Sequence, residues 1–269
     1  MKKRLTLLAL ATSLTTALTL SLSASFSAHA ADKLVIGASP TPHAEILEHL
    51  KPLLAAQGVE LDIKVFTDYI QPNVQLAEKR LDANFFQHKP FMDEFNRSRG
   101  TTLQVVTEVF VAPFGAYSNK VKAIADLKEG AVVAIPNDAV NGGRALQLLH
   151  QAGVIALADP KNNMASEKDI VSNPKKIKLK QLEAPMLPRV LPEVDLAVIN
   201  TTFALEAKLN PAKDALFLEG NKSLFVNLLA ARADNKDSPA MQKLSAALRS
   251  VDTRQYINER FKGSLAPVF

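Results

Sequence analysis

A glycine-rich turn in the middle of the chain offers the clearest chemistry. Asn141-Gly142-Gly143-Arg144 follows an apolar run that ends at Pro136, and it opens a segment with helical spacing. We expect Asn141 to cap this helix and the two glycines to leave its first N–H groups open to an anion. The guanidinium of Arg144 can bind a carboxylate through two parallel hydrogen bonds. The alternative is a glycine-rich loop with a solvated arginine, and the pattern alone favours neither.

Two asparagines could bind other polar atoms of the same ligand. Asn200 ends the apolar run 196–199, and Asn227 lies inside the apolar run 224–229. A buried asparagine needs hydrogen-bond partners, and its side-chain oxygen can accept from an ammonium group. For either residue alone, a local bond within a turn is the simpler interpretation.

An aromatic pair marks a third candidate region. The stretch 82–95, DANFFQHKPFMDEF, places Phe85 and Phe86 side by side, and His88 follows two positions after Phe86. Neighbouring residues of a strand point to opposite faces of the sheet. We therefore expect at least one of the two phenylalanines to leave the core and line a binding site.

The sequence contains no familiar catalytic or metal-binding pattern. It lacks a nucleophile elbow, a phosphate-binding loop and a dinucleotide-binding glycine motif. His43 and His49 resemble a metal pair, but residues six apart lie about 240° apart around a helix. We therefore expect no catalytic residues, no metal and no cofactor, and the chain is not predicted to be an enzyme.

The elements that must position these residues alternate between strands and helices. Apolar or alternating runs predict strands at 34–38, 60–65, 83–87, 103–111, 131–135, 177–181, 196–199, 216–218 and 224–231. Helical spacing predicts helices at 42–57, 70–79, 90–97, 142–152, 202–208, 239–250 and 253–261. This order is typical of an α/β fold with mainly parallel sheets. The pattern restarts near 113–117 without a flexible linker, which favours two lobes around a ligand-binding cleft.

The N-terminus is typical of a secretory signal peptide. Basic residues at positions 2–4 precede an uncharged stretch that runs to about position 27. Ala28-His29-Ala30 fits a signal-peptidase site, so we expect residues 1–30 to be removed by cleavage near Ala30. A membrane anchor is the alternative, although many Ser and Thr residues dilute the stretch.

Composition narrows the location and the partners. The 269 residues include no cysteine, which excludes disulfides and lipid attachment through an N-terminal cysteine. Without the three bases of the signal, the net charge falls from +5 to about +2, which gives no indication of nucleic-acid binding. The basic stretch 174–180 fits a strand with one solvated face. These features predict a soluble protein of the bacterial periplasm.

Several stretches resemble the NlpA group of methionine-binding lipoproteins of bacterial ABC importers. They occur in the family's order and are 37–47 (GASPTPHAEIL), 68–73 (DYIQPN), 82–90 (DANFFQHKP), 141–146 (NGGRAL), 187–189 (LPR) and 195–200 (DLAVIN). The resemblance implies a two-lobed periplasmic binding protein whose chain crosses twice between the lobes. It implies a first lobe of residues 31–114 and 230–269 and a second lobe of residues 115–229, with the ligand in the cleft.

The resemblance also implies roles for the candidate residues. Tyr69, Phe86 and His88 would line the pocket, with Phe85 a further candidate, and such an aromatic wall suits the sulfur of a thioether. From the other side, Arg144 would hold the ligand's carboxylate beside Asn141. The ammonium and carboxylate ends would contact Asn200 and Asn227.

The implied function is delivery of methionine, as the L or the D form, by a monomer to an ABC permease in the inner membrane. Two alternatives stay open. The same fold could bind another apolar amino acid, a methionine derivative or a short peptide. An exported enzyme or adhesin could also reuse the fold, since a fold does not fix a function.

Overall fold

The computed structural model describes residues 31–220 and 223–269, so the predicted signal peptide lies outside the described residues. Residues 31–269 form one compact unit. Within the described residues, no helix has both the length and the apolar character that a membrane span requires.

A six-stranded sheet is built from both ends of this unit. Its strands lie in the order β13-β4-β12-β3-β1-β2. Their bounds are β1 Asp32–Ala38, β2 Val59–Val65, β3 Ala83–His88, β4 Gln104–Val111, β12 Val226–Ala231 and β13 Ala266–Pro267. β1 pairs in parallel with β2 and β3, whereas the pairings of β12 with β3 and β4, and of β13 with β4, are antiparallel.

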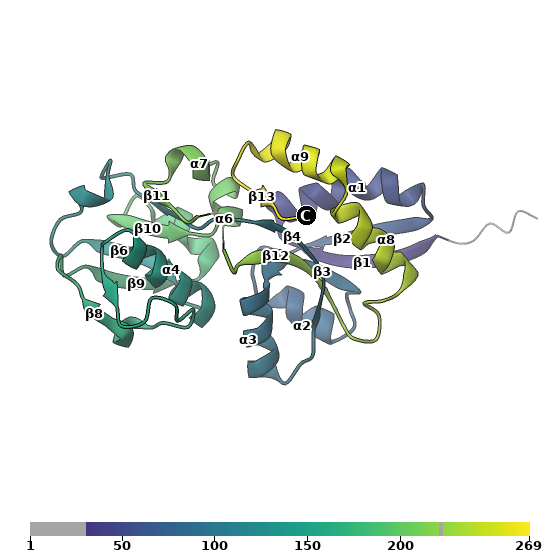
Figure 1. The fold of residues 1–269 in the computed structure, drawn as a ribbon, viewed down its shortest axis with the longest axis horizontal. Helices are drawn as coiled ribbons and strands as arrows, with labels where there is room; N and C mark the ends of the chain where they lie inside the picture. The colour runs from purple at the N-terminus through teal and green to yellow at the C-terminus, as the bar shows by residue number, and fades with distance from the viewer. Residues whose placement is uncertain (1–30, 221–222) are drawn as a thin grey trace, which may run out of the picture. The chain divides into compact units, whose positions relative to one another are not determined.

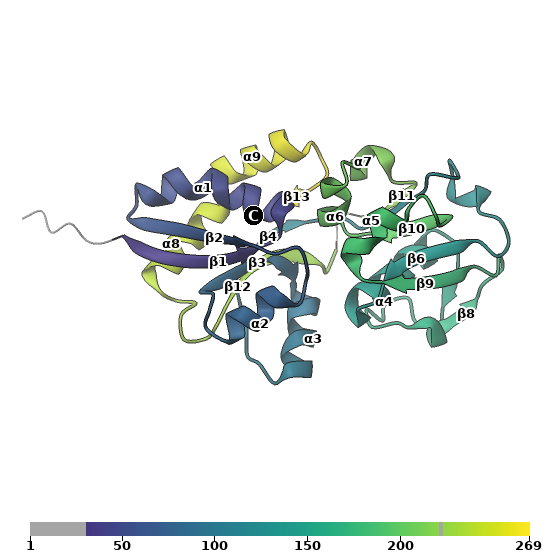
Figure 2. The same ribbon diagram turned by 180° about the vertical axis from the view of Figure 1, so that it is seen from behind.

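Helices cover both faces of this sheet. Figures 1 and 2 show α1 (Glu45–Ala55), α8 (Pro239–Leu248) and α9 (Val251–Phe261) on one face. The other face carries α2 (Gln71–Ala77) and α3 (Lys89–Arg99). A turn, η1 (Pro40–Ala44), in which Thr41 has an extended backbone, leads into α1.

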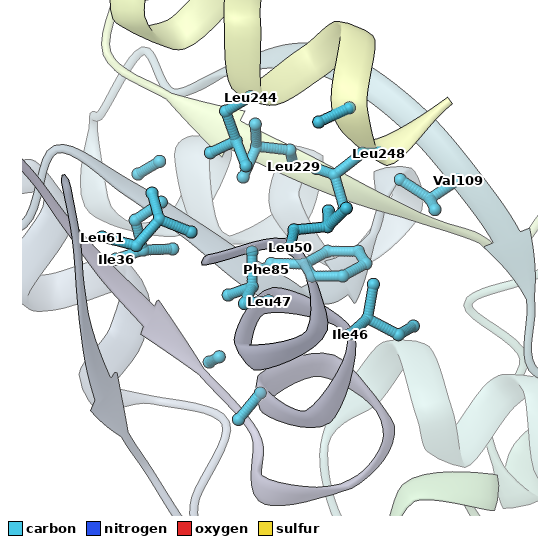
Figure 3. Packing of buried hydrophobic residues seen from close by; sticks show 14 of the residues in the cluster. Ile36, Ile46, Leu47, Leu50, Leu61, Phe85, Val109, Leu229, Leu244 and Leu248 are labelled. Atoms are coloured by element: carbon cyan, nitrogen blue, oxygen red, sulfur yellow. The ribbon is translucent and has the colours of Figure 1, made fainter. Parts of the chain in front are cut away.

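The core of this region forms because α1 has its apolar residues on one side. Ile46, Leu47, Leu50 and Leu54 recur at helical spacing, and all four are fully buried. Figure 3 shows three of them packed with leucines of α8 around Phe85 of β3. Full burial of each such side chain contributes roughly 1.5–3 kcal/mol.

A five-stranded sheet is built from the middle of the chain. Its order is β11-β5-β10-β6-β9. The strands are β5 Gly115–Tyr117, β6 Val132–Pro136, β9 Lys178–Leu182, β10 Leu196–Ile199 and β11 Phe217–Leu218. β6 pairs in parallel with β9 and β10, whereas β5 pairs antiparallel with β10 and β11.

Short elements complete this part of the chain. Its helices are α4 (Ala139–Gln151), α5 (Leu187–Val190), α6 (Thr201–Glu206) and α7 (Pro211–Asp214). β7 (Ala156–Leu157) and β8 (Ile170–Ser172) form a separate two-stranded ladder. The 3-10 turns are η2 (Ile124–Asp126), η3 (Glu167–Asp169) and η4 (Ala184–Met186).

The structure contains every strand and helix that the sequence predicts, with end points shifted by a few residues. The expectation of mainly parallel sheets is wrong, because both sheets are mixed. The reason lies in the two connections between the sheets. β4 leads through residues 112–114 into β5, and β11 leads back into β12, which inserts between β3 and β4 and runs antiparallel to both.

The whole of β12 belongs to the six-stranded sheet. Residues 226–229, which the sequence assigned to the second lobe, therefore pair with strands that the sequence assigned to the first. The division into two lobes, 31–114 with 230–269 and 115–229, stays a prediction.

Candidate functional site

A cavity lies where side chains from the two sheets and their helices meet. Its lining residues are Tyr69, Phe86, Gln87, His88, Phe91, Ala112, Asn141, Arg144, Asn200, Thr201, Thr202 and Asn227. Seven of the eight residues predicted from the sequence line this cavity, and only Phe85 does not.

Aromatic rings form one side of the cavity. The ring centroid of Tyr69 lies 5.7 Å from that of Phe86, 6.1 Å from that of Phe91 and 4.9 Å from that of Phe203 in α6. Burial raises the pKa of Tyr69, so its hydroxyl stays protonated at neutral pH. These distances are those of favourable aromatic pairs, which makes this side of the cavity a continuous apolar wall.

Phe85 is part of the core instead of the cavity. Its ring packs edge-on against His43, with centroids 4.8 Å apart, and lies 5.7 Å from Phe110. Of the two adjacent phenylalanines, only Phe86 lines the cavity. Phe85 is therefore removed from the candidate binding set.

A β-bulge explains why three consecutive residues of β3 line the cavity. In the pairing of β3 with β12, Gln87 lies opposite Leu228 and Phe85 lies opposite Leu229, so Phe86 has no partner. Such a bulge interrupts the alternation of faces and redirects side chains. Phe86, Gln87 and His88 can therefore all contribute to the site, although strict alternation would turn Gln87 away.

The glycine-rich turn differs from the prediction. Helix α4 begins at Ala139, and its cap is Asp138, whose carboxylate accepts the Asn141 N–H at 2.8 Å. Asn141 is thus the third residue of the helix and not its cap. The Gly142 N–H donates to the Asp138 carbonyl at 2.7 Å, so it is not open to an anion.

The glycines instead allow close packing. A Cβ atom on Gly143 would lie 2.5 Å from the backbone oxygen of Asn163, and one on Gly142 would lie 3.0 Å from that of Pro136. Anion binding at this turn therefore depends on the side chain of Arg144 and not on the start of the helix.

Arg144 is buried, and its guanidinium is held from several directions. Its Nε donates to Glu219 Oε1 at 3.1 Å, and its Nη2 donates to Glu219 Oε2 and, at 3.0 Å, to the Ala112 carbonyl. The guanidinium carbon lies 4.5 Å from the ring centroid of Phe114 and 4.2 Å from that of Phe225. Within the described part of the chain, Nη1 has no hydrogen-bond partner, so its two N–H groups are available to a ligand.

A chain of amides lies beside Arg144. The Asp138 carboxylate accepts from the Asn141 side-chain nitrogen at 3.0 Å and 3.1 Å. Asn141 Oδ1 in turn accepts from the Asn200 side-chain nitrogen at 3.1 Å. This arrangement leaves Asn200 Oδ1 buried without a partner among residues 31–220 and 223–269. A buried acceptor of this kind indicates a missing donor.

His88 is hydrogen-bonded to the same group of amides, and its ring is neutral. The Phe91 N–H donates to His88 Nδ1 at 3.3 Å, so the ring proton lies on Nε2, which donates to Asn141 Oδ1 at 3.3 Å. Burial, and secondly the charge of Arg144, lowers the pKa of His88 to about 3.

Asn227 is oriented by a histidine that lies outside the cavity lining. His43 is fully buried, and its Nε2 lies 2.8 Å from Asn227 Oδ1. Burial lowers the pKa of His43 to about 4, so the neutral ring donates from Nε2. Since its oxygen is occupied, Asn227 offers the cavity its Nδ2 donors.

Sequence reasoning missed five lining residues: Gln87, Phe91, Ala112, Thr201 and Thr202. Gln87 is fixed by a buried network in which its side chain exchanges two hydrogen bonds of 2.7 Å with Asn73 and donates to Asn84 at 2.9 Å. Gln87 and Asn73 lie in stretches that carry the family resemblance, and that was the one available signal. In the described residues, no group of three potential metal ligands is found.

Three comparisons place the chain among known proteins. The model of the family described as NlpA lipoprotein matches residues 34–269. The probable D-methionine-binding lipoprotein MetQ of Pasteurella multocida is 40% identical over 238 residues, which cover 88% of this chain and 86% of that protein.

Solved structures of similar proteins have the same fold. A nutrient binding protein from Burkholderia cenocepacia bound to methionine has a TM-score of 0.85 and 40% identity, covering 88% of this chain and 100% of that chain. An ABC transporter periplasmic substrate-binding protein from Coxiella burnetii has a TM-score of 0.84 and 38% identity, covering 87% and 100%. These similarities confirm the predicted α/β periplasmic-binding-protein fold. All three relatives are named as binding proteins, in agreement with a chain that binds its ligand without transforming it.

Proposed function

The chain belongs to the NlpA lipoprotein family, and on that premise we propose that it captures methionine and delivers it to an ABC importer. The observation that carries the proposal is a pair of unused polar groups in one cavity. Among the residues that the structure describes, Arg144 Nη1 donates to no partner, and Asn200 Oδ1 accepts from none. A zwitterionic amino acid has a carboxylate for the first and an ammonium for the second.

The contacts support a separate role for each polar side chain toward the ligand. Asn227 supports the carboxylate together with Arg144, because His43 occupies its oxygen and leaves only donors. Asn200 accepts from the ammonium, because Asn141 occupies its nitrogen and leaves only the oxygen. The amide chain that starts at Asp138 holds this oxygen in place.

The aromatic wall supports a thioether side chain. A sulfur atom gains ~0.3–1.5 kcal/mol from each contact with a ring, and Tyr69, Phe86 and Phe91 offer three rings. The relative from Burkholderia cenocepacia, with 40% identity, is bound to methionine.

The proposal extends to location and partners. The 269 residues contain no cysteine that could carry a lipid. We therefore place the mature chain, cleaved near Ala30, in the periplasm without a lipid on cysteine. It would act as a monomer that presents methionine to a permease of the inner membrane. Ligand contacts from both predicted lobes would favour the closed arrangement, because only that arrangement makes both sets of contacts.

Native mass spectrometry of the chain purified without added ligand, followed by calorimetry, tests the proposal. We expect methionine to be released on denaturation, or to bind one-to-one when either enantiomer is added. Binding of another apolar amino acid, a methionine derivative or a dipeptide, with no binding of L- or D-methionine, would contradict the proposal. Chemical conversion of the ligand would identify an enzyme instead.

A further inference from the structure

Glu219 is a buried acid next to the cavity with no role in the function proposed above. It follows β11, at the start of the connection back to β12. Its side chain is only 12% exposed, and both carboxylate oxygens accept from Arg144. The Phe114 N–H also donates to Oε2 at 3.3 Å. The acid therefore forms an ion pair with the charged residue that is proposed to bind the ligand's carboxylate.

Arg144 and Glu219 form a pair of opposite charges at the cavity. Among the described lining residues, Arg144 is the only one that is charged at neutral pH, since His88 and Tyr69 are both neutral. Glu219 balances that charge from behind the guanidinium. A zwitterion has no net charge, so the ligand proposed above adds no net charge to this pair.

Arg144 has little freedom to change this balance. Ala112 and Phe114 hold its guanidinium from the connection between β4 and β5, and Glu219 and Phe225 hold it from the connection between β11 and β12. With Nε and Nη2 occupied, only Nη1 keeps donors without a partner among the described residues. A ligand carboxylate must therefore share the guanidinium with Glu219.

We propose that Glu219 is a specificity-determining positioning residue, which makes the site select a zwitterionic amino acid over the corresponding carboxylic acid without an ammonium group. The proposal rests on the function proposed above. A ligand without the ammonium would place two carboxylates on one buried guanidinium and leave Asn200 Oδ1 unpaired. A buried excess of negative charge is unfavourable, whereas an ammonium on Asn200 restores the balance.

The test compares two ligands in matched variants by calorimetry. Methionine is the zwitterion, and 4-(methylthio)butanoate has the same carboxylate and thioether without the ammonium. In the unchanged protein we expect methionine to bind far more tightly. Glu219→Gln keeps the shape of the side chain and an acceptor for Arg144, but it removes the negative charge. We expect this variant to reduce the preference for methionine by at least about tenfold, mainly through tighter binding of the anion.

The control is Glu129→Gln, which removes the same formal charge from an exposed pair with Lys176. We expect it to leave the preference unchanged. A Glu219→Gln variant that binds methionine with an unchanged preference would contradict the role of Glu219 alone. An unchanged protein that binds neither ligand would contradict the proposed function instead.

Glu219→Asp keeps the charge on a shorter side chain and covers the case in which Glu219→Gln does not fold. We expect it to keep the preference within about threefold of the unchanged protein, even if both affinities fall. Loss of the preference in Glu219→Asp would mean that side-chain shape and not charge sets the selectivity, and it would overturn the proposal.

Discussion

The two sides of the cavity are built in different ways. On the polar side, hydrogen bonds within the protein hold Arg144, Asn200 and Asn227. In each side chain these bonds leave one nitrogen or oxygen atom for a ligand. On the aromatic side, Tyr69 and Phe86 are held by ring packing, which accepts small shifts. The difference indicates that the polar side fixes the ligand class, an α-amino acid, whereas the aromatic side sets a preference for its side chain.

The largest effect is expected on the polar side, from Arg144→Ala. It removes the donors for the ligand's carboxylate, and a charged hydrogen bond is worth roughly 1.5–3 kcal/mol. We expect methionine to bind ~10- to 100-fold more weakly by calorimetry. It also leaves Glu219 buried without its partner, so the thermal midpoint should fall as well.

Arg189→Ala is the matched control for this variant. Arg189 is exposed and lies outside the cavity lining, so neither the affinity nor the thermal midpoint should change. An unchanged affinity in Arg144→Ala would remove Arg144 from the site.

Asn200→Ala should have the next largest effect. It removes the acceptor proposed for the ammonium, but it also removes a buried oxygen that has no partner in the described structure. We therefore expect about tenfold weaker methionine binding without a loss of thermal stability. Weaker binding of methionine and of 4-(methylthio)butanoate by the same factor would show that Asn200 does not contact the ammonium.

Phe86→Leu should have a smaller effect, because leucine keeps most of the apolar contact and loses only the ring. We expect methionine to bind a few-fold more weakly, which corresponds to ~0.3–1.5 kcal/mol for one sulfur–ring contact. Binding of norleucine, which has no sulfur, serves as the control and should change less. Equal losses for both ligands would leave general packing as the role of the ring.

The smallest effect is expected from pH. The pKa values of His88, about 3, and His43, about 4, lie below the ordinary value of 6.5, so both rings stay neutral in the folded protein above about pH 5. Methionine affinity should therefore be constant from about pH 5.5 to 8. A loss of affinity with a midpoint near pH 6.5 would show that one of the rings titrates in the folded state.

The free energy of unfolding should depend on pH, although the affinity for methionine should not. Between pH 6.5 and about 4 the unfolded chain binds protons at these histidines and the folded chain does not. The free energy of unfolding should therefore fall as the pH drops through this window and level off above it. Thermal melting across this pH range measures the effect.

Where local stretches carry the family resemblance, the residues chosen from the sequence come together in the structure. Phe86, Arg144 and Asn200 all lie in such stretches, and all three line the cavity. Phe85 was included because both phenylalanines were kept as candidates, although alternation along a strand places only one of them on the cavity face. The bulge opposite Leu228 and Leu229, which adds Gln87 to the lining, has no local signature. Asn141 was assigned as the cap because it precedes the glycines, although Asp138 had an equally suitable side chain.

Contacts between distant parts of the chain could not be predicted. Glu219 lies 75 positions from Arg144, and His43 lies 184 positions from Asn227. No periodicity joins such residues, and the sequence suggested only that His43 resembles a metal ligand. The direction of β12 also could not be predicted, because it depends on the end of the sheet at which the chain re-enters.

A crystal structure of the mature chain with methionine tests the central claim most directly. We expect the ligand's carboxylate to accept from Arg144 Nη1 and from the Asn227 side-chain nitrogen at about 2.7–3.2 Å. The ammonium should donate to Asn200 Oδ1, with the sulfur against Tyr69 and Phe86. A ligand bound in the reverse direction, with its carboxylate away from Arg144, would contradict the account of the two sides of the cavity.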